Sequence, residues 1–188
     1  MNLIIFGPPG AGKGTQADFI VNKYNLHQLS TGEVLRNEIK NQTKLGQEIS
    51  SIINSGTLVS DDVVKKLVES FVSESKYKNR LIFDGYPRNL IQAKTLNELL
   101  TKYGQKIDLV LKLSVSLETI KKRISERRTQ EKRADDSEEI AIKRYKTYEK
   151  STEPVIEYYK KLNLLKVIDG ERSIDQINKE ISDIIDFI

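Results

Sequence analysis

The sequence contains no cysteine and a single histidine, His27. Without cysteine the chain forms no disulfide and offers no thiolate ligand, and one histidine cannot make a histidine cluster. Because zinc sites in proteins are built mainly from cysteine and histidine, we expect no zinc site. The fold must therefore rest on a hydrophobic core, and 188 residues are enough to bury a sheet under helices in one domain.

Long apolar runs are also missing. The first six residues are too short an apolar run for a secretory signal, and no basic segment precedes them. No stretch approaches the ~20 apolar residues that a membrane span needs. The net charge of +4 is modest, and the lysines are spread among glutamates rather than gathered with aromatic residues. We expect a cytoplasmic protein with no membrane or nucleic-acid partner and, without an obvious apolar stripe, a monomer.

Short apolar runs alternate with amphipathic segments along the chain, and we interpret them as strands and helices. The expected strands are 3–6, 27–29, 80–83, 109–113 and 165–168. The expected helices are 13–24, two within 31–59, then 61–75, 89–103, 116–127, 138–162 and 174–188. This alternation predicts an α/β fold whose parallel sheet has helices on both faces. In such folds ligands bind at the carboxyl ends of the strands, so the segments that follow the strands should form the site.

A glycine-rich segment, Gly7-Pro-Pro-Gly-Ala-Gly-Lys-Gly-Thr15, follows the first expected strand and opens the first helix. Glycines let consecutive backbone N–H groups approach phosphate oxygens, and the helix points its positive end at the same anion. Lys13 then supplies a cation for the β- and γ-phosphates. The general pattern is G-x-x-x-x-G-K-[ST], and here Gly14 takes the last place, with Thr15 after it. Its position between strand and helix still predicts a site for nucleotide phosphates.

Residues 7–16 resemble the nucleotide-binding loop of adenylate kinases and related nucleoside monophosphate kinases, in which Gly-Thr after the lysine is usual. The resemblance continues in order to Gly170. It implies a P-loop kinase fold, three-layer α/β/α with a five-stranded parallel sheet. The single domain, 1–188, would comprise a core (1–29, 60–126 and 138–188), a helical monophosphate-binding region (30–59) and a short lid (127–137). It also implies that Thr15 assists Mg²⁺ and that ATP is bound by Gly10, Ala11, Gly12, Lys13, Gly14 and Thr15.

A second motif, Phe83-Asp-Gly-Tyr-Pro-Arg88, ends an apolar strand. A carboxylate at this position, Asp84, is where a P-loop enzyme orders Mg²⁺ and its waters. The tight turn that follows directs Arg88 toward the phosphates. Gln92 lies one helical turn further on and on the same side. Its amide can both donate to and accept from an adenine edge, which makes it a candidate for base recognition.

The resemblance also places an AMP site. Residues 29–36 resemble the segment that receives the monophosphate, with Thr31 at the base and Arg36 at the α-phosphate. Gly56–Val59 matches the stretch that closes over the adenine, although Thr57 stands where a lysine is frequent. Related uridylate and cytidylate kinases more often carry alanine for Thr31 and asparagine near Gln92, so these residues favour AMP. The implied AMP-binding residues are Thr31, Arg36, Thr57, Leu58, Val59, Gly85, Tyr86, Pro87, Arg88, Gln92, Arg133 and Arg144.

Several arginines fall in the third quarter of the chain. Arg123 and Arg127 lie one helical turn apart on one face. Guanidinium groups bind phosphate oxygens bidentately and keep their charge, which suits the neutralisation of several phosphates. By resemblance, Arg123 and Arg127 serve ATP, whereas Arg133 and Arg144 serve AMP and the transferred group. The segment 127–137 is too short for the folded, sometimes zinc-binding lid of many bacterial adenylate kinases, so we expect a loop.

The resemblance implies Mg²⁺-dependent transfer between ATP and AMP, which gives two ADP, by direct attack of an AMP phosphate oxygen on the γ-phosphorus. The turn Asp169–Arg172 resembles the one beneath the ATP adenine, which Arg172 would contact mainly through its backbone. The nearest alternative is a UMP or CMP kinase, and a P-loop kinase for another small alcohol or acid is more distant. A non-catalytic nucleotide switch is a third alternative, but the chain has no Asn-Lys-x-Asp guanine-reading motif. The implied catalytic residues are Lys13, Arg88, Arg123, Arg133 and Arg144.

Overall fold

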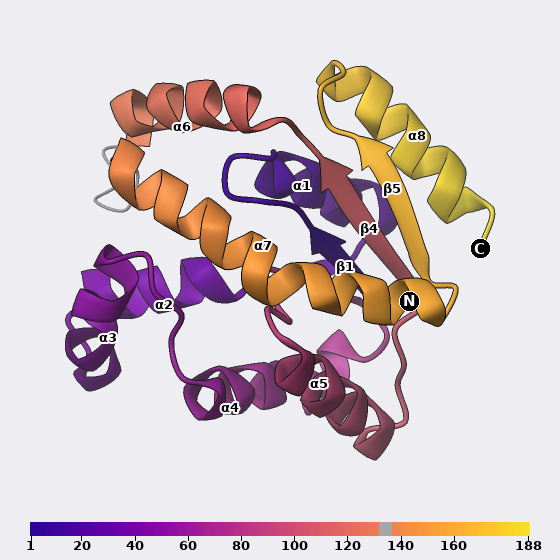
Figure 1. The fold of residues 1–188 in the computed structure, drawn as a ribbon. Coiled ribbons are helices and arrows are strands. Elements are labelled where there is room, and N and C mark those ends of the chain that lie inside the picture. Colours follow the sequence, from indigo (N-terminus) through magenta and orange to yellow (C-terminus); the bar gives the residue numbers. More distant parts are fainter. Residues whose placement is uncertain (132–136) are drawn as a thin grey trace.

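The computed structural model describes residues 1–131 and 137–188, in which helices cover both faces of one parallel sheet (Figure 1). The strands are β1 (Leu3–Phe6), β2 (His27–Ser30), β3 (Leu81–Asp84), β4 (Leu109–Ser114) and β5 (Leu165–Asp169). The helices are α1 (Lys13–Tyr24), α2 (Thr31–Lys40), α3 (Lys44–Asn54), α4 (Asp61–Val72), α5 (Leu90–Lys102), α6 (Leu117–Glu131), α7 (Glu138–Lys161) and α8 (Ile174–Asp186). The predicted α/β fold and its element order are confirmed.

The sheet has the strand order β2-β3-β1-β4-β5, and every neighbouring pair is parallel. β1 is central, so Leu3 is aligned with Ile82 of β3 on one side and with Leu109 of β4 on the other. The chain leaves β1 toward β2 but leaves β3 toward β4, so these adjacent strands send their following segments in opposite directions. Such a divergence opens a crevice beyond the strand ends, where ligands of α/β proteins bind.

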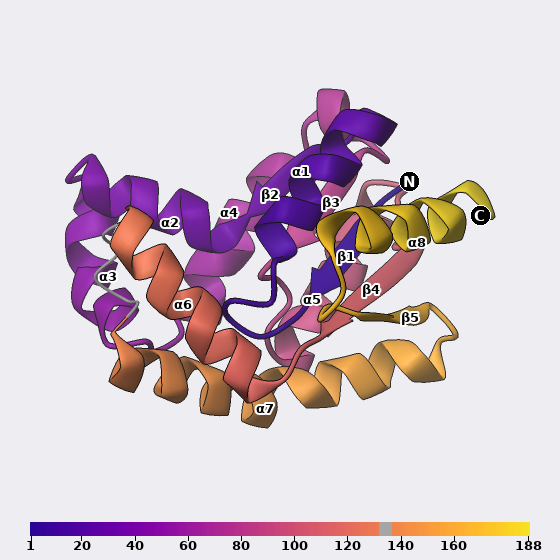
Figure 2. The same ribbon diagram turned by 90° about the horizontal axis from the view of Figure 1, so that it is seen from above.

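The core lies in two layers because successive residues of a strand point to opposite faces of the sheet. From β1, Ile4 and Phe6 are buried with residues of α5 and α7, whereas Leu3 and Ile5 are buried with residues of α1 and α8. Figure 2 shows α1 and α8 on one side of the sheet and α5 and α7 on the other. Burial on both faces explains why the central strands are continuous apolar runs in the sequence.

Two helix ends differ from expectation. α6 continues to Glu131, although we expected it to end near Arg127. Residues 128–131 are polar, but arginine, glutamine and glutamate favour helices, so polarity alone does not end one. α4 ends at Val72 and is followed by a 3₁₀ turn, Ser75–Tyr77, where we expected one continuous helix. The expected lid, 127–137, thus begins inside α6, and part of it, including Arg133, lies outside the described residues.

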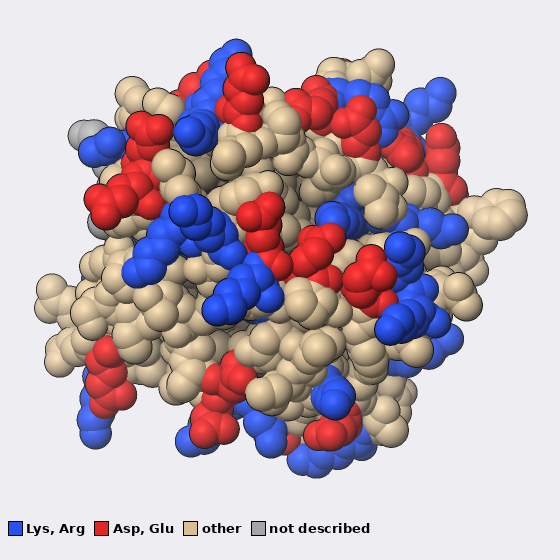
Figure 3. All heavy atoms as spheres, viewed as in Figure 1, with Lys and Arg blue, Asp and Glu red and all other residues tan. Residues whose placement is uncertain are grey.

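The surface carries mixed charge. On the face shown in Figure 3, lysine and arginine side chains are interspersed with aspartate and glutamate. Lys102 with Glu69 and Lys112 with Glu153 form two of the ion pairs, at 2.9 and 2.6 Å. Across residues 1–131 and 137–188, no helix is both long and apolar enough to cross a membrane.

Candidate active site

The loop between β1 and α1 has the backbone geometry of an anion site. Gly10 and Gly12 have φ angles of +83° and +91°, which side chains other than glycine rarely adopt. The amide of Ala11 donates to the carbonyl of Pro8 at 3.1 Å and closes the turn. α1 begins at Lys13, so the unpaired N–H groups of its first turn face the same space. The segment therefore has the strand, loop and helix arrangement that phosphate binding requires.

Lys13 is held inside this loop. Its Nζ donates to the carbonyl oxygens of Gly7 at 2.8 Å and Pro8 at 3.1 Å. Burial lowers the pKa of Lys13 from its usual 10.5 to about 8; Asp84 opposes this shift, and nearby arginines including Arg88 add to it. Without an added anion, the charged form of Lys13 is therefore less favourable than in water.

This pKa shift predicts a pH dependence of stability. The folded chain releases the Lys13 proton near pH 8, whereas the unfolded chain releases it near 10.5. Between these values the unfolded chain binds more protons, so the contribution of Lys13 to the free energy of unfolding rises with pH. Relative to Lys13→Met, the protein should gain about 1–3 kcal/mol between pH 7.5 and 10. Urea denaturation of both proteins at several pH values measures this difference in the free energy of unfolding. If the free energies of the two proteins change with pH in parallel, the pKa of Lys13 is not lowered.

Asp84 lies at the carboxyl end of β3 and is 8% exposed. Its Oδ2 accepts a hydrogen bond from Nε2 of Gln28, on the neighbouring strand β2, at 3.1 Å. A carboxylate has further lone pairs, so this contact holds Asp84 without exhausting its capacity to accept. Gln28 was not singled out in the sequence, although parallel pairing of β2 with β3 brings both residues to the same sheet edge.

A pocket opens beyond the ends of β1 and β3. Its volume is about 1060 Å³, which includes the space at its mouth that is open to solvent. It combines an apolar wall with converging polar and charged groups, as small-molecule sites usually do. Residues from the loop after β1, from α2, from the segment before α4, from the turn after β3 and from α7 meet there. The predicted residues that line it are Lys13, Thr31, Arg36, Thr57, Leu58, Val59, Gly85, Pro87, Arg88, Gln92 and Arg144.

Two arginines converge over Gly32 at one end of the pocket. A Cβ atom added to Gly32 would lie 3.2 Å from a guanidinium nitrogen of Arg36 and 3.6 Å from one of Arg88. Nε of Arg88 donates to the carbonyl of Gly85 at 2.6 Å, and Oγ1 of Thr31 donates to the same oxygen at 3.1 Å. Guanidinium groups bind phosphate oxygens, so two of them converging on one side of the pocket suit a phosphate ligand.

Two of the residues predicted to bind ATP, Arg123 and Arg172, have partners at the end of β5 and in the turn after it. Arg123 of α6 donates to the carbonyl of Ala11 at 3.4 Å and to that of Gly170 at 2.9 Å. Arg172 pairs with Glu180 and with Asp169. Several predicted residues are not in the lining of the pocket, and their roles stay predictions. They are Gly10, Ala11, Gly12, Gly14, Thr15, Asp84, Tyr86, Arg123, Arg127 and Arg172.

Two residues of α7 that line the pocket, Tyr148 and Thr152, were not predicted from the sequence. Arg144, Tyr148 and Thr152 of α7 follow one another at intervals of four, and all three line the pocket. Oγ1 of Thr152 donates to the carbonyl of Arg88 at 3.1 Å and supports the turn that carries this arginine. The spacing from Arg144 was a signal that could have identified the other two, because residues four apart share a helix face.

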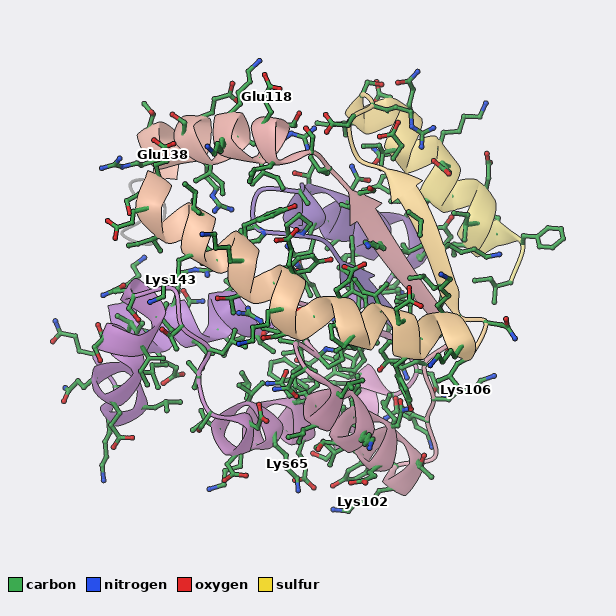
Figure 4. The ribbon with its side chains drawn as sticks, in the orientation of Figure 1. Lys65, Lys102, Lys106, Glu118, Glu138 and Lys143 are labelled. Carbon is green, nitrogen blue, oxygen red and sulfur yellow. The ribbon has the colours of Figure 1, made fainter. Side chains whose placement is uncertain are left out.

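The predicted monophosphate-binding region, residues 30–59, touches α7. Nζ of Lys143 lies 3.5 Å from Oγ1 of Thr57, and Figure 4 labels this lysine on the part of α7 nearest to α2 and α3. A Cβ atom added to Gly56 would lie 3.1 Å from Cγ of Arg144. The segment expected to cover a base therefore rests against the helix that presents Arg144.

Comparison with known proteins decides the family. The family model described as adenylate kinase matches residues 5–164, most of the chain and all of the pocket. The chain belongs to the adenylate kinase family. This membership confirms the resemblance seen in the sequence, the P-loop kinase fold, and adenylate kinase function with phosphotransferase activity toward a nucleoside monophosphate.

Relatives in this family align over nearly the whole chain. Adenylate kinase of Pelagibacter ubique is 44% identical over 98% of this chain and 99% of its own. That of Fusobacterium nucleatum is 42% identical over 98% of each chain, and that of Caulobacter sp. is 41% identical over 94% of each. The Pelagibacter alignment spans 211 positions, more than the 188 residues of this chain, so that relative has residues without a counterpart here. The Caulobacter relative, by contrast, is similar in length to this chain.

Proposed function

We propose that the pocket beyond β1 and β3 binds AMP and that ATP reaches it from the phosphate loop, so that the γ-phosphoryl group passes between them and two ADP form. The observation that supports this assignment is the convergence of Lys13 with Arg36, Arg88 and Arg144, from four different segments, in one pocket. Phosphoryl transfer asks mainly for alignment and charge neutralisation, which converging cations on a rigid frame supply.

The reaction needs no covalent intermediate with the protein. An oxygen of the AMP phosphate attacks the γ-phosphorus of ATP, the bond from that phosphorus to the β-bridging oxygen breaks, and ADP leaves with the electron pair. Backbone amides of residues 10–15 and Lys13 would hold the β- and γ-phosphates. Arg36 and Arg88 would hold the AMP phosphate, and Arg123, Arg127, Arg133 and Arg144 would complete the charge balance.

We assign Mg²⁺ to Asp84 and Thr15, through water. Asp84 keeps lone pairs beyond the one that accepts from Gln28, and Thr15 is exposed in the first turn of α1. This donor set fits Mg²⁺, which usually retains several waters and takes one or two protein oxygens beside the phosphates of its ligand. When bound, the ion neutralises charge on the β- and γ-phosphates of ATP.

We assign the base of AMP to Thr31, Gln92 and the Thr57–Val59 segment, all of which line the pocket. A UMP or CMP kinase would need the pocket to suit a smaller pyrimidine. Leu35, Ile53 and Val64 also line the pocket and provide apolar surface for a purine ring. We also propose that the chain works as a cytoplasmic monomer in which 127–137 serves as the lid.

A coupled assay of ADP formation tests the nucleotide assignment. With saturating ATP and Mg²⁺, AMP should be preferred over UMP, CMP and GMP by about 10-fold or more in kcat/KM, because a site built for one base leaves polar groups unpaired with another. Preference for a pyrimidine monophosphate would replace the AMP assignment by the pyrimidine kinase alternative. Binding of ATP without turnover of any monophosphate would favour the nucleotide switch.

A further inference from the structure

The side-chain amide of Gln92 is held at both of its ends. Its Oε1 accepts from the backbone N–H of Arg88 at 2.7 Å, and its Nε2 donates to Oδ1 of Asp61 at 2.7 Å. The side chain is 3% exposed, so water competes little with these bonds. Gln92 lines the pocket, whereas Asp61 does not. Asp61 therefore touches the pocket through Gln92.

Asp61 is positioned for this contact by the first turns of α4 and α5. It is the first residue of α4, and its carboxylate also accepts from Nδ2 of Asn89, at 3.0 and 3.3 Å. Asn89 caps α5, and its Oδ1 accepts from the backbone N–H of Gln92 at 2.8 Å. One carboxylate thus binds both the cap of α5 and the amide that lies one turn further along.

The two partners of Gln92 permit one orientation of its amide. A carboxylate only accepts hydrogen bonds, and a backbone N–H only donates them. Turning the amide over would place its NH₂ against the N–H of Arg88 and its oxygen against the carboxylate of Asp61. Both favourable bonds would become repulsive contacts, and buried polar groups would lose their partners. The positions of the amide oxygen and nitrogen are therefore fixed from both sides.

A fixed amide distinguishes bases by the polarity of their edge. One N–H of Nε2 and one lone pair of Oε1 remain after the two bonds described above. Adenine offers an acceptor at N1 beside a donor at N6, which matches an amide in one orientation. Hypoxanthine has nearly the same shape but offers a donor at N1 beside an acceptor at O6, and it matches the reversed amide.

We propose that Asp61 is a positioning residue that locks the orientation of Gln92 and so sets the preference for AMP over inosine monophosphate (IMP). The proposal rests on the proposed function, because it takes Gln92 as the residue that meets the base. It gives Asp61 a role in the selection of the base, although Asp61 does not line the pocket. Asp62, the next residue of α4, is exposed and carries the same charge, which makes it a matched control.

Steady-state kinetics with ATP and either AMP or IMP tests the proposal in Asp61→Asn, Gln92→Ala and Asp62→Asn. Asparagine keeps the shape of Asp61 but can offer either an acceptor or a donor, so only the backbone N–H of Arg88 still favours one orientation of Gln92. The AMP-to-IMP ratio of kcat/KM should fall about 10-fold in Asp61→Asn, mainly through a higher KM for AMP, with kcat nearly unchanged. Asp62→Asn should keep the ratio within roughly twofold of the starting protein.

A second measurement needs no turnover. In the starting protein, the Nε2 proton of Gln92 that bonds to Asp61 should exchange slowly with water in a ¹⁵N-resolved NMR spectrum, and Asp61→Asn should shift its signal and speed its exchange while Asp62→Asn does not. An unchanged AMP-to-IMP ratio in Asp61→Asn, together with a lowered ratio in Gln92→Ala, overturns the role of Asp61 and leaves the AMP site standing. An unchanged ratio in Gln92→Ala, or a starting protein that does not phosphorylate AMP, overturns the base assignment and the proposal with it.

Discussion

Replacing Lys13 with methionine should lower the turnover number by about 100-fold or more, as the loss of one preorganised charge stabiliser typically does. Methionine keeps the length and apolar body of lysine but brings no charge to the β- and γ-phosphates. Because burial already disfavours the charged form of Lys13 in the protein alone, the substitution should leave the fold intact. The measurement is kcat at saturating ATP, AMP and Mg²⁺, with a thermal unfolding curve for each protein.

Lys23→Met is the matched control for this experiment. Lys23 lies in the last turn of the same helix, where its Nζ is 3.5 Å from Asp186 at the surface. Exposed ion pairs of this kind contribute little to stability, so the control should keep normal turnover. A Lys13→Met protein that folds and turns over normally would remove Lys13 from the mechanism.

Arg88→Ala should reduce kcat/KM for AMP by about 100-fold or more, because it removes the charged contact that we propose Arg88 makes to the phosphate of AMP. Arg88→Lys should recover little of this loss. A lysine cannot donate to the carbonyl of Gly85 and present a planar pair of donors to a phosphate at the same time. The measurement is the initial rate as a function of AMP concentration at saturating ATP.

The control for Arg88 is Lys94→Ala, on the exposed side of the following helix. It removes a nearby positive charge without touching the pocket lining, and its kcat/KM should match the starting protein. If Lys94→Ala and Arg88→Ala lose activity equally, the effect reflects the general electrostatic potential of the surface and not a specific contact. If neither loses activity, the assignment of the AMP phosphate to Arg88 is wrong.

The sequence predicted those parts of the fold and site that depend on residues close together in the chain. The phosphate loop was identifiable because its glycines, its lysine and the flanking strand and helix all lie within 24 residues. The strands β1, β3 and β4 were identifiable because burial on both faces makes β1 entirely apolar and gives β3 and β4 apolar runs of three residues at their starts. The length of α6 could not be predicted. Residues 128–131 are polar, as loop residues often are, but their types also have good helix propensity.

Contacts between residues far apart in the sequence could not be predicted from the periodicity of apolar residues. Asp61 and Gln92 are 31 residues apart, and Gln28 and Asp84 are 56 apart. The first pair meets because α4 packs against α5, and the second because β2 pairs with β3. Neither packing can be predicted without the arrangement of the elements in space. Tyr86 illustrates a further limit: it belongs to the motif that resembles an AMP site, yet it is 1% exposed, and its hydroxyl donates to the carbonyl of Gln92 at 3.2 Å.

The two bonds of Arg123 give the two ends of the nucleotide crevice different stiffness. One planar guanidinium joins the carbonyl of Ala11 to that of Gly170, so the loops after β1 and β5 cannot separate without breaking a hydrogen bond. At the opposite end, residues 30–59 meet α7 through long side chains such as Lys143, which yield more easily. Adjustment to a bound nucleotide should therefore be larger between residues 30–59 and α7 than between the loops after β1 and β5.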